Sequence, residues 1–194
     1  MILLSAVLAG IFAGWGYARW QGRAWHPPVY RFIWLVFAGF LPQYVAFYLP
    51  LTRGLLPNIV ASACLVLSQT LLSIFAFVNL GLPGMRILLV GLVCNLIVIL
   101  ANGGFMPLSL DAAARLVDQT VLDGLVLGQR VSSASKDVLL TESQIRLSWL
   151  ADRFVPPAII SYRFAFSLGD VLVAVGAFWM LLVGRQPAAQ LGDV

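Results

Sequence analysis

Charged residues are scarce in this sequence. Only 10% of its 194 residues are charged, whereas an ordinary soluble domain is about 25% charged. Hydrophobic residues make up 61% of the chain, and the mean hydropathy is +0.94. A soluble fold of this size has no interior large enough to bury so much apolar surface. The composition therefore excludes an ordinary soluble domain and predicts a membrane protein.

Cysteine and histidine are scarce as well. Cys64 and Cys94 lie within apolar runs, with neither a CxxC spacing nor a nearby histidine, so we expect small buried hydrophobes. His26 is the single histidine and precedes Pro27 and Pro28 in a basic, tryptophan-containing segment. We interpret it as an interfacial side chain, with ligation of a pigment or haem left open. A metal site needs several such ligands at fixed geometry, so none is expected, and no particular cofactor is indicated.

Common catalytic and nucleic-acid-binding motifs are also missing. The chain has no glycine-rich phosphate loop and no Ser-His-Asp set. Its net charge is +4, but the basic residues stand singly at the ends of apolar runs, where they direct membrane topology and anchor helices. Because no basic cluster exists, we expect no nucleic-acid partner. Ser133 or Ser135 with Lys136 is a weak alternative as a Ser-Lys nucleophile.

Long apolar runs recur along the chain. Each is close to the roughly 20 residues that a helix needs to span a bilayer. They predict an all-α integral membrane protein, a single membrane domain over residues 1–194. It would be a bundle of about five transmembrane helices, at residues 2–18, 32–49, 58–80, 87–101 and 164–183. Gly10 and Gly14 have the GxxxG spacing that lets helices approach closely, and Pro42 is expected to bend the second helix.

A long polar loop over residues 102–163 carries most of the charge. Ser109 is expected to cap a short surface helix that continues through Asp118. Thr141 with Gln144 has the spacing of a capping box for a second short helix. Between them, residues 120–131 fit either a small hairpin or an apolar loop.

The arginines of the short loops predict the orientation in the membrane. One side has five of them and the other has Arg53 alone; the five are Arg19, Arg23, Arg31, Arg86 and Arg185. With five helices, this places the N-terminus outside, the C-terminus in the cytoplasm and the long loop outside.

Three short segments resemble a known family. They are ANGGFMP at residues 101–107, LADRFVPP at 150–157 and FAFSLGDV at 164–171. The chain resembles an uncharacterised family of small bacterial inner-membrane proteins, domain of unknown function 5317. The resemblance implies a multi-pass protein of the bacterial plasma membrane and brings no activity with it. It directs attention to Asn102, Gly103, Gly104, Asp152, Ser167, Gly169 and Asp170.

Asp170 stands out without that resemblance. A carboxylate at mid-bilayer costs about 2.5–3.5 kcal/mol on insertion scales, so it usually faces a partner or a wet cavity. Six residues after Phe164, it is expected about 9 Å below the start of the helix, near the outer boundary. Its candidate partners are Ser167, Asn102, the backbone of Gly103 and Gly104, Arg153 and Arg163. Such contacts would clamp the loop onto the bundle. Whether residues 102–107 re-enter the membrane stays open.

Gln69 and Asn95 are the other polar residues of interest within apolar runs. Both are expected to lie deeper than Asp170 and to form hydrogen bonds between helices, as uncharged amides usually do in membranes.

Three functions are compatible with these residues. The first is a non-enzymatic accessory or interaction subunit that contacts membrane lipids and either a membrane-protein partner or further copies of itself. The second is a small transporter or channel that uses Asp170 with Gln69 and Asn95. The third, less favoured, is a membrane enzyme that acts on a lipid-linked substrate at the outer leaflet through Asp152, Arg153 and Asp170.

Overall fold

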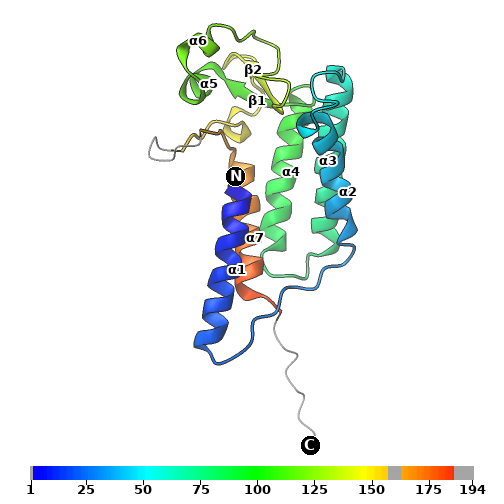
Figure 1. The fold of residues 1–194 in the computed structure, drawn as a ribbon, viewed down its shortest axis with the longest axis vertical. Helices are drawn as coiled ribbons and strands as arrows, with labels where there is room; N and C mark the ends of the chain where they lie inside the picture. The colour runs from blue at the N-terminus through cyan, green and yellow to red at the C-terminus, as the bar shows by residue number, and fades with distance from the viewer. Residues whose placement is uncertain (1, 157–162, 186–194) are drawn as a thin grey trace, which may run out of the picture.

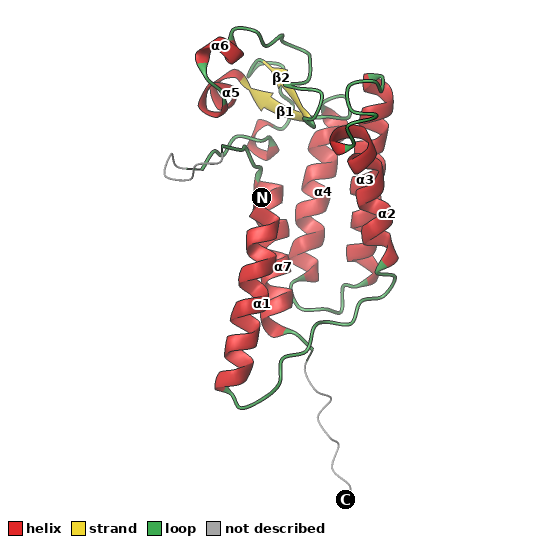
Figure 2. Cartoon of the chain, in the orientation of Figure 1, coloured by secondary structure: helices red, strands yellow, loops and turns green. Residues whose placement is uncertain are grey.

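The structure is a computed structural model that describes residues 2–156 and 163–185. Its described part is mostly helical, with one small sheet (Figures 1 and 2). Five apolar helices form the body: α1 (Ile2–Trp20), α2 (Trp34–Gln43), α3 (Asn58–Val78), α4 (Met85–Ala101) and α7 (Leu168–Val183). A small subdomain at one end of them comprises residues 102–156 and is called the loop subdomain below. Residues 157–162 of the expected outer loop, including Pro157 of the LADRFVPP motif, lie outside the described residues.

The last helix packs between the first and the fourth. Contacts join α1 to α7, α7 to α4, α4 to α3 and α3 to α2, and Figure 1 shows the same neighbours. Gly10 and Gly14 are buried on the side of α1 that faces α7. A Cβ atom at Gly14 would lie 2.5 Å from the carbonyl oxygen of Leu181. The GxxxG pair therefore lies where two helices approach most closely.

These helices keep much of their apolar surface exposed. Helices α1 and α3 are long and apolar enough to cross a membrane, and only 17% and 33% of their apolar windows are buried. Phe12, Phe37 and Phe77 are more than 60% exposed, at 69%, 72% and 64%. The core helix of a soluble protein would bury such residues. The exposed apolar surface indicates association with a membrane.

The second helix becomes irregular after Pro42. Helix α2 continues into a π-helical turn, Tyr44–Tyr48, in which Leu49 N–H donates to Tyr44 O at 2.9 Å. Proline lacks the N–H that a regular helix uses, and a π-helical turn is one of the known sources of bending. The irregularity that follows Pro42 is thus a π-helical turn.

The loop subdomain contains a two-stranded parallel sheet that the sequence analysis did not predict. Strand β1 (Met106–Ser109) pairs with β2 (Asp137–Leu140). The hairpin considered for residues 120–131 is wrong, since α6 (Gln119–Leu122) and a loop occupy that stretch. Helix α5 (Leu110–Leu116) does begin after Ser109, whose Oγ accepts from Ala112 N–H at 3.2 Å.

The prediction of a second short surface helix after Thr141 is also wrong. Thr141 N–H does donate to the side chain of Gln144 at 3.2 Å, but only turns follow, then a 3-10 turn at Ser148–Leu150. Leu147 has a φ of 58°, a left-handed conformation that a right-handed helix cannot contain. A right-handed helix that begins at Thr141 therefore cannot continue through Leu147.

Helix α7 begins at Leu168, four residues later than expected. Phe166 instead pairs with Phe154 as an antiparallel bridge, with N–H to O distances of 2.9 and 3.1 Å. The two rings stack at a centroid distance of 5.6 Å. This pairing holds the segment before α7 extended, and it places Asp170 in the first turn of the helix.

Candidate functional site

Asp170 belongs to a capped helix start. Ser167 Oγ accepts from Asp170 N–H at 3.0 Å, and an Asp170 carboxylate oxygen accepts from Ser167 N–H at 3.2 Å. This reciprocal pair is a capping box. It satisfies two backbone donors that would otherwise be unpaired at the start of α7.

Asn95 of α4 joins this cap from the neighbouring helix. Its Nδ2 donates to Asp170 Oδ1 at 2.9 Å, and its Oδ1 accepts from Ser167 Oγ at 2.9 Å. Asn95 therefore lies at the level of Asp170, and the expectation that it would lie deeper is wrong. The reason is that α4 extends past the start of α7, so that Asn95, six residues before the end of α4 at Ala101, lies beside the first turn of α7.

Gly169 makes this contact sterically feasible. A Cβ atom at this position would collide with Asn95 Oδ1 and would lie 2.8 Å from Gly91 O. Only glycine lets α7 approach α4 closely enough for the amide to reach the cap. We call Asn95, Ser167, Gly169 and Asp170 the cap network.

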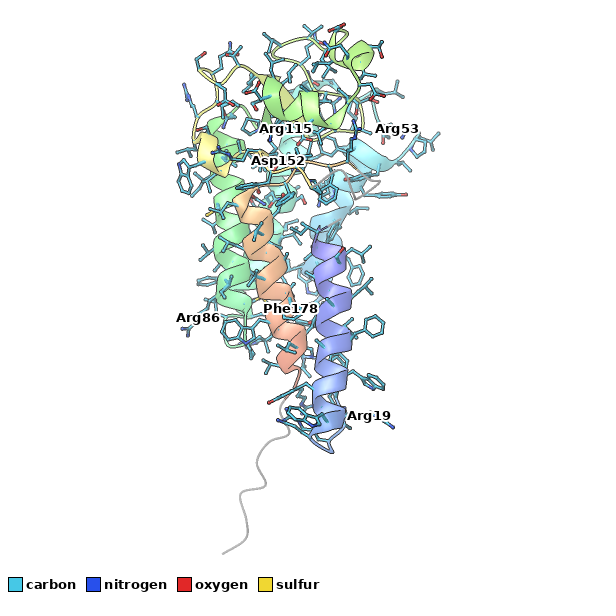
Figure 3. The ribbon with its side chains drawn as sticks, turned by 90° about the vertical axis from the view of Figure 1, so that its left-hand side faces the viewer. Arg19, Arg53, Arg86, Arg115, Asp152 and Phe178 are labelled. Atoms are coloured by element: carbon cyan, nitrogen blue, oxygen red, sulfur yellow. The ribbon has the colours of Figure 1, made fainter. Side chains whose placement is uncertain are left out.

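A second polar pair lies beside the cap network. Asp152 is 1% exposed, and its Oδ2 accepts from Lys136 Nζ at 2.8 Å. Lys136 Nζ also lies 3.6 Å from Asp137 Oδ1. Figure 3 places Asp152 at the junction between the loop subdomain and the helices. We call Lys136 and Asp152 the junction pair, and Asp137 is its acidic neighbour.

Burial and charge shift the pKa values of the junction pair. Burial raises the pKa of Asp152 to about 7; Lys136 opposes this rise, and the carboxylates of Asp137 and Asp170 add to it. Burial lowers the pKa of Lys136, but attraction to Asp152, Asp137 and Asp170 outweighs this effect and raises it. Asp170 of the cap network therefore interacts electrostatically with both members of the junction pair. Lys136 therefore stays protonated at neutral pH.

The small sheet positions the junction pair. Lys136 immediately precedes β2, and its carbonyl accepts from Met106 N–H at 3.0 Å. On the other side of β1, Asp152 N–H donates to Pro107 O at 3.3 Å, and Asp152 bridges to Leu108. Strand β1 thus separates two segments whose side chains meet. No local motif in the sequence announces this pairing.

The turn after α4 has a different role from the one expected. Asn102 accepts from Arg146 N–H and donates to Arg146 O, both at 2.9 Å, instead of contacting Asp170. Gly103 and Gly104 have φ values of 79° and 87°, which favour glycine. They direct the chain from α4 into β1, away from the helices (Figure 1). This turn holds the loop subdomain on α4.

The candidate arginines do not reach Asp170 either. The Arg153 guanidinium lies 6.0 Å from the centroid of the Phe154 ring, and Arg163 is 3.7 Å from Asp118. Ser135 does not pair with Lys136, because its Oγ donates to Asp137 Oδ2 at 2.9 Å. Lys136 pairs with acids instead.

A small hollow adjoins Asp152. It has a volume of about 20 Å³ and is lined by Ser109, Glu142, Ser148 and Arg153 among others. A volume of this size holds about one water molecule. Asp152 Oδ1 is buried and has no hydrogen-bond partner in the part of the chain that the structure describes. The hollow has room for one small polar molecule.

Gln69 lies apart from these groups, within α3. Its Oε1 and the neighbouring Ser68 Oγ are buried without a hydrogen-bond partner among the described residues. Ser68 itself is fully buried. Gln69 therefore has no hydrogen bond to Asp170 or Asn95 in this arrangement.

His26 and a residue not considered before, Asn79, tie the first loop to the helices. His26 is exposed, and its carbonyl accepts from Arg185 N–H at 2.9 Å. Asn79 exchanges two hydrogen bonds with the backbone of Arg31, at 2.8 and 2.9 Å. Asn79 lies at the C-terminal end of α3. A polar residue directly after an apolar run was the feature of the sequence that could have pointed to it.

Comparison with known proteins identifies a family without a known activity. A model described as "Family of unknown function (DUF5317)" matches residues 29–182. No curated protein and no solved structure matches the chain.

Proposed function

Because the chain belongs to the family of unknown function DUF5317, we propose from its geometry that it is a five-helix membrane protein acting as a non-enzymatic accessory or interaction subunit. The observation that carries this proposal is that the polar side chains of the cap network and of the junction pair are engaged in contacts within the chain. Asn95 joins α4 to the start of α7, and Lys136 joins Asp152 inside the loop subdomain, beside a hollow of about 20 Å³. The backbone bridge of Phe154 to Phe166 and the hydrogen bonds of Asn102 to Arg146 hold the loop subdomain on the helices.

The distribution of acids supports the membrane placement. Every acidic residue of the described chain lies in the loop subdomain or in the first turn of α7. At the opposite end, the described loops contain arginine and no acid. Basic residues accumulate on the cytoplasmic side of bacterial membranes. We therefore place the loop subdomain and the N-terminus outside, and the C-terminus in the cytoplasm of a bacterial inner-membrane protein.

Exposed apolar side chains on the loop subdomain support an interaction role. Helix α6 lies at its end farthest from the helices (Figure 1). Val121 on α6 is 51% exposed, and Val126 and Leu127 after it are 56% and 47% exposed. Lipid tails do not reach this end of the molecule in the proposed placement. A partner or a second copy of the chain would gain hydrophobic contact there.

Cysteine labelling tests the placement. With Cys64 and Cys94 replaced by alanine, we expect a membrane-impermeant maleimide to label Ser132→Cys in intact spheroplasts. Gln21→Cys should react only after permeabilisation. Both positions are exposed. The reverse pattern would contradict the orientation.

Native mass spectrometry after gentle release from the membrane tests the interaction role. We expect a stoichiometric complex with a partner or with further copies, lost in Val126→Asp with Leu127→Asp. Leu55→Asp is the control, since Leu55 is 79% exposed on another loop. A lone chain that moves a solute across proteoliposomes would contradict the proposal.

One observation favours transport as a second candidate function. The buried, unpaired Ser68 and Gln69 groups in α3 are unusual among the described residues, and intramembrane polar groups often mark a solute pathway. Transport predicts flux in proteoliposomes that Gln69→Leu, which removes the unpaired amide, reduces strongly. Absence of flux, or flux unchanged by that substitution, would contradict this candidate.

A further inference from the structure

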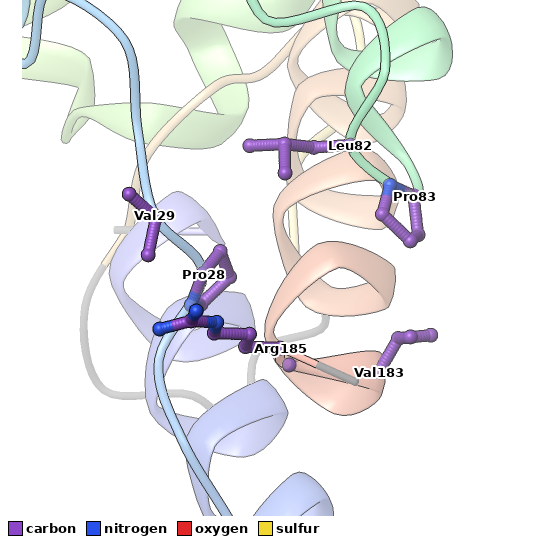
Figure 4. Close-up of a pocket in the computed structure, with 7 residues that line it drawn as sticks. Pro28, Val29, Leu82, Pro83, Val183 and Arg185 are labelled. Atoms are coloured by element: carbon purple, nitrogen blue, oxygen red, sulfur yellow. The ribbon is translucent and has the colours of Figure 1, made fainter. Parts of the chain in front are cut away.

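An apolar hollow lies at the end of the molecule opposite the loop subdomain. Its volume is about 430 Å³, within the range of small-molecule sites. Three separate segments line it: Pro28 and Val29, then Leu82 and Pro83, then Val183 to Arg185. In Figure 4, Pro28 and Val29 face Leu82 and Pro83, with Arg185 beside Pro28. Only the Arg185 side chain among these residues is charged.

Hydrogen bonds fix the wall formed by the first loop. At one end, Arg185 N–H donates to His26 O at 2.9 Å. At the other end, Asn79 binds the backbone of Arg31. Pro27 and Pro28 lie between these anchors and restrict the backbone further. The hollow is therefore largely preformed, which lowers the entropic cost of binding.

The charge at this end suits an anionic ligand. Arg19, Arg23, Arg31, Arg86 and Arg185 lie in or beside its loops, and the described loops there have no acid. A guanidinium binds a phosphate through parallel charge-assisted hydrogen bonds. The leaflet that faces the cytoplasm is rich in anionic lipid. A ligand that matches both features has an anionic head and an apolar chain.

We propose that this hollow binds an anionic phospholipid of the cytoplasmic leaflet. Its phosphate would contact the Arg185 guanidinium, and an acyl chain would follow Leu82, Pro83 and Val183. The inference rests on the membrane placement proposed above, because it requires this end of the bundle to lie at the cytoplasmic interface.

Titration of the detergent-purified full chain, followed by native mass spectrometry, tests the site. The probes are phosphatidylglycerol and phosphatidylcholine with identical acyl chains. We expect one retained phosphatidylglycerol and a preference of about tenfold over phosphatidylcholine, because both lipids carry the phosphate but the choline cation cancels its charge and is repelled by the arginines. Arg185→Gln should abolish the preference. Arg19→Gln is the matched control, because Arg19 lies at the same end but does not line the hollow, and it should keep the preference.

Two further arms separate the headgroup from the chain. Val29→Trp fills the hollow without changing charge and should lower phosphatidylglycerol retention. Glycerol 3-phosphate, which lacks acyl chains, should not displace the lipid at equal concentration. Displacement by it, equal loss in Arg19→Gln and Arg185→Gln, or normal binding by Arg185→Gln would each overturn the proposal.

The labelling experiment separates this failure from a failure of the placement. If the Ser132→Cys and Gln21→Cys pattern holds while phosphatidylglycerol shows no preference, the lipid site alone is wrong. If the pattern is reversed, the placement on which the site depends is wrong, and the lipid proposal falls with it.

Discussion

At the scale of single residues, Asp152 has the most unusual environment in the described chain. One of its oxygens binds Lys136, and the other is buried without a partner among the residues that the structure describes. An ion pair with one fully buried partner is weak evidence for stability, because the lost hydration of Asp152 offsets much of the attraction. The pair can still fix one arrangement of the segments that bear it. Here those segments flank β1 and meet the start of α7.

The raised pKa of Asp152 predicts a pH dependence of stability. Its pKa in the folded protein is about 7, against 3.8 for an aspartate side chain in water. Between these values the native state binds the proton more tightly, so the free energy of unfolding falls as pH rises from about 4 to 7. Each kcal/mol lost should lower Tm by about 2–4 °C. Asp152→Asn should flatten the Tm profile over this range; profiles of equal slope would contradict the assignment.

Ser167 predicts a second residue-level effect. It caps α7 and also donates to Asn95. Ser167→Ala removes the cap acceptor and leaves Asn95 Oδ1 without this donor, so we expect a loss of about 1–3 kcal/mol. Ser132→Ala, on an exposed loop, is the control. Chemical unfolding in detergent measures both, and equal stability of the two variants would argue against the cap network.

At the scale of elements, glycines determine how closely α7 approaches its neighbours. Gly91 and Gly169 meet across α4 and α7, and so do Gly84 and Gly176. On the other side of α7, Gly10 and Gly14 admit α1. In a bilayer, close packing of this kind is a main source of helix association.

Substitution of one glycine tests this packing. Gly169→Ala should destabilise the protein by about 1–3 kcal/mol, because its methyl group has no space beside Asn95. Gly16→Ala is the matched control, since a Cβ there meets nothing within 4 Å. It should be neutral or stabilise α1 by about 0.5–1 kcal/mol. Tm values for the pair measure the difference, and a similar loss in both would contradict the packing argument.

The elements differ in how far the sequence predicts them. The apolar runs locate the helices, since length and hydropathy are local properties. The start of α7 was misplaced because Phe166 pairs with Phe154, a distant partner. The pairing of β1 with β2 is equally non-local, so the sequence did not reveal that Lys136 meets Asp152. Asn95 and Asp170 were noted separately, but only the helix packing brings them together.

At the scale of the whole molecule, charge is distributed unevenly between the two ends. Figure 3 shows Arg19 and Arg86 far from Asp152 along the long axis. Replacement of Arg19, Arg23 and Arg31 by glutamine should weaken the orientation bias. We expect a fraction of Ser132→Cys to escape labelling in intact spheroplasts. Arg115→Gln with Arg146→Gln, in the long loop, is the control. Full labelling of both would contradict a topology set by these arginines.

The position of α7 between α1 and α4 has a consequence for biogenesis. About 150 residues separate the end of α1 from the start of α7, and ribosomes add about 5–20 residues per second. The face of α1 that carries Gly10 and Gly14 is thus without its partner for about 7–30 seconds. During that interval lipids or insertion factors must cover it. A ribosome that stalls before Leu168 would release a chain whose first helix has no neighbour, which quality-control proteases can recognise.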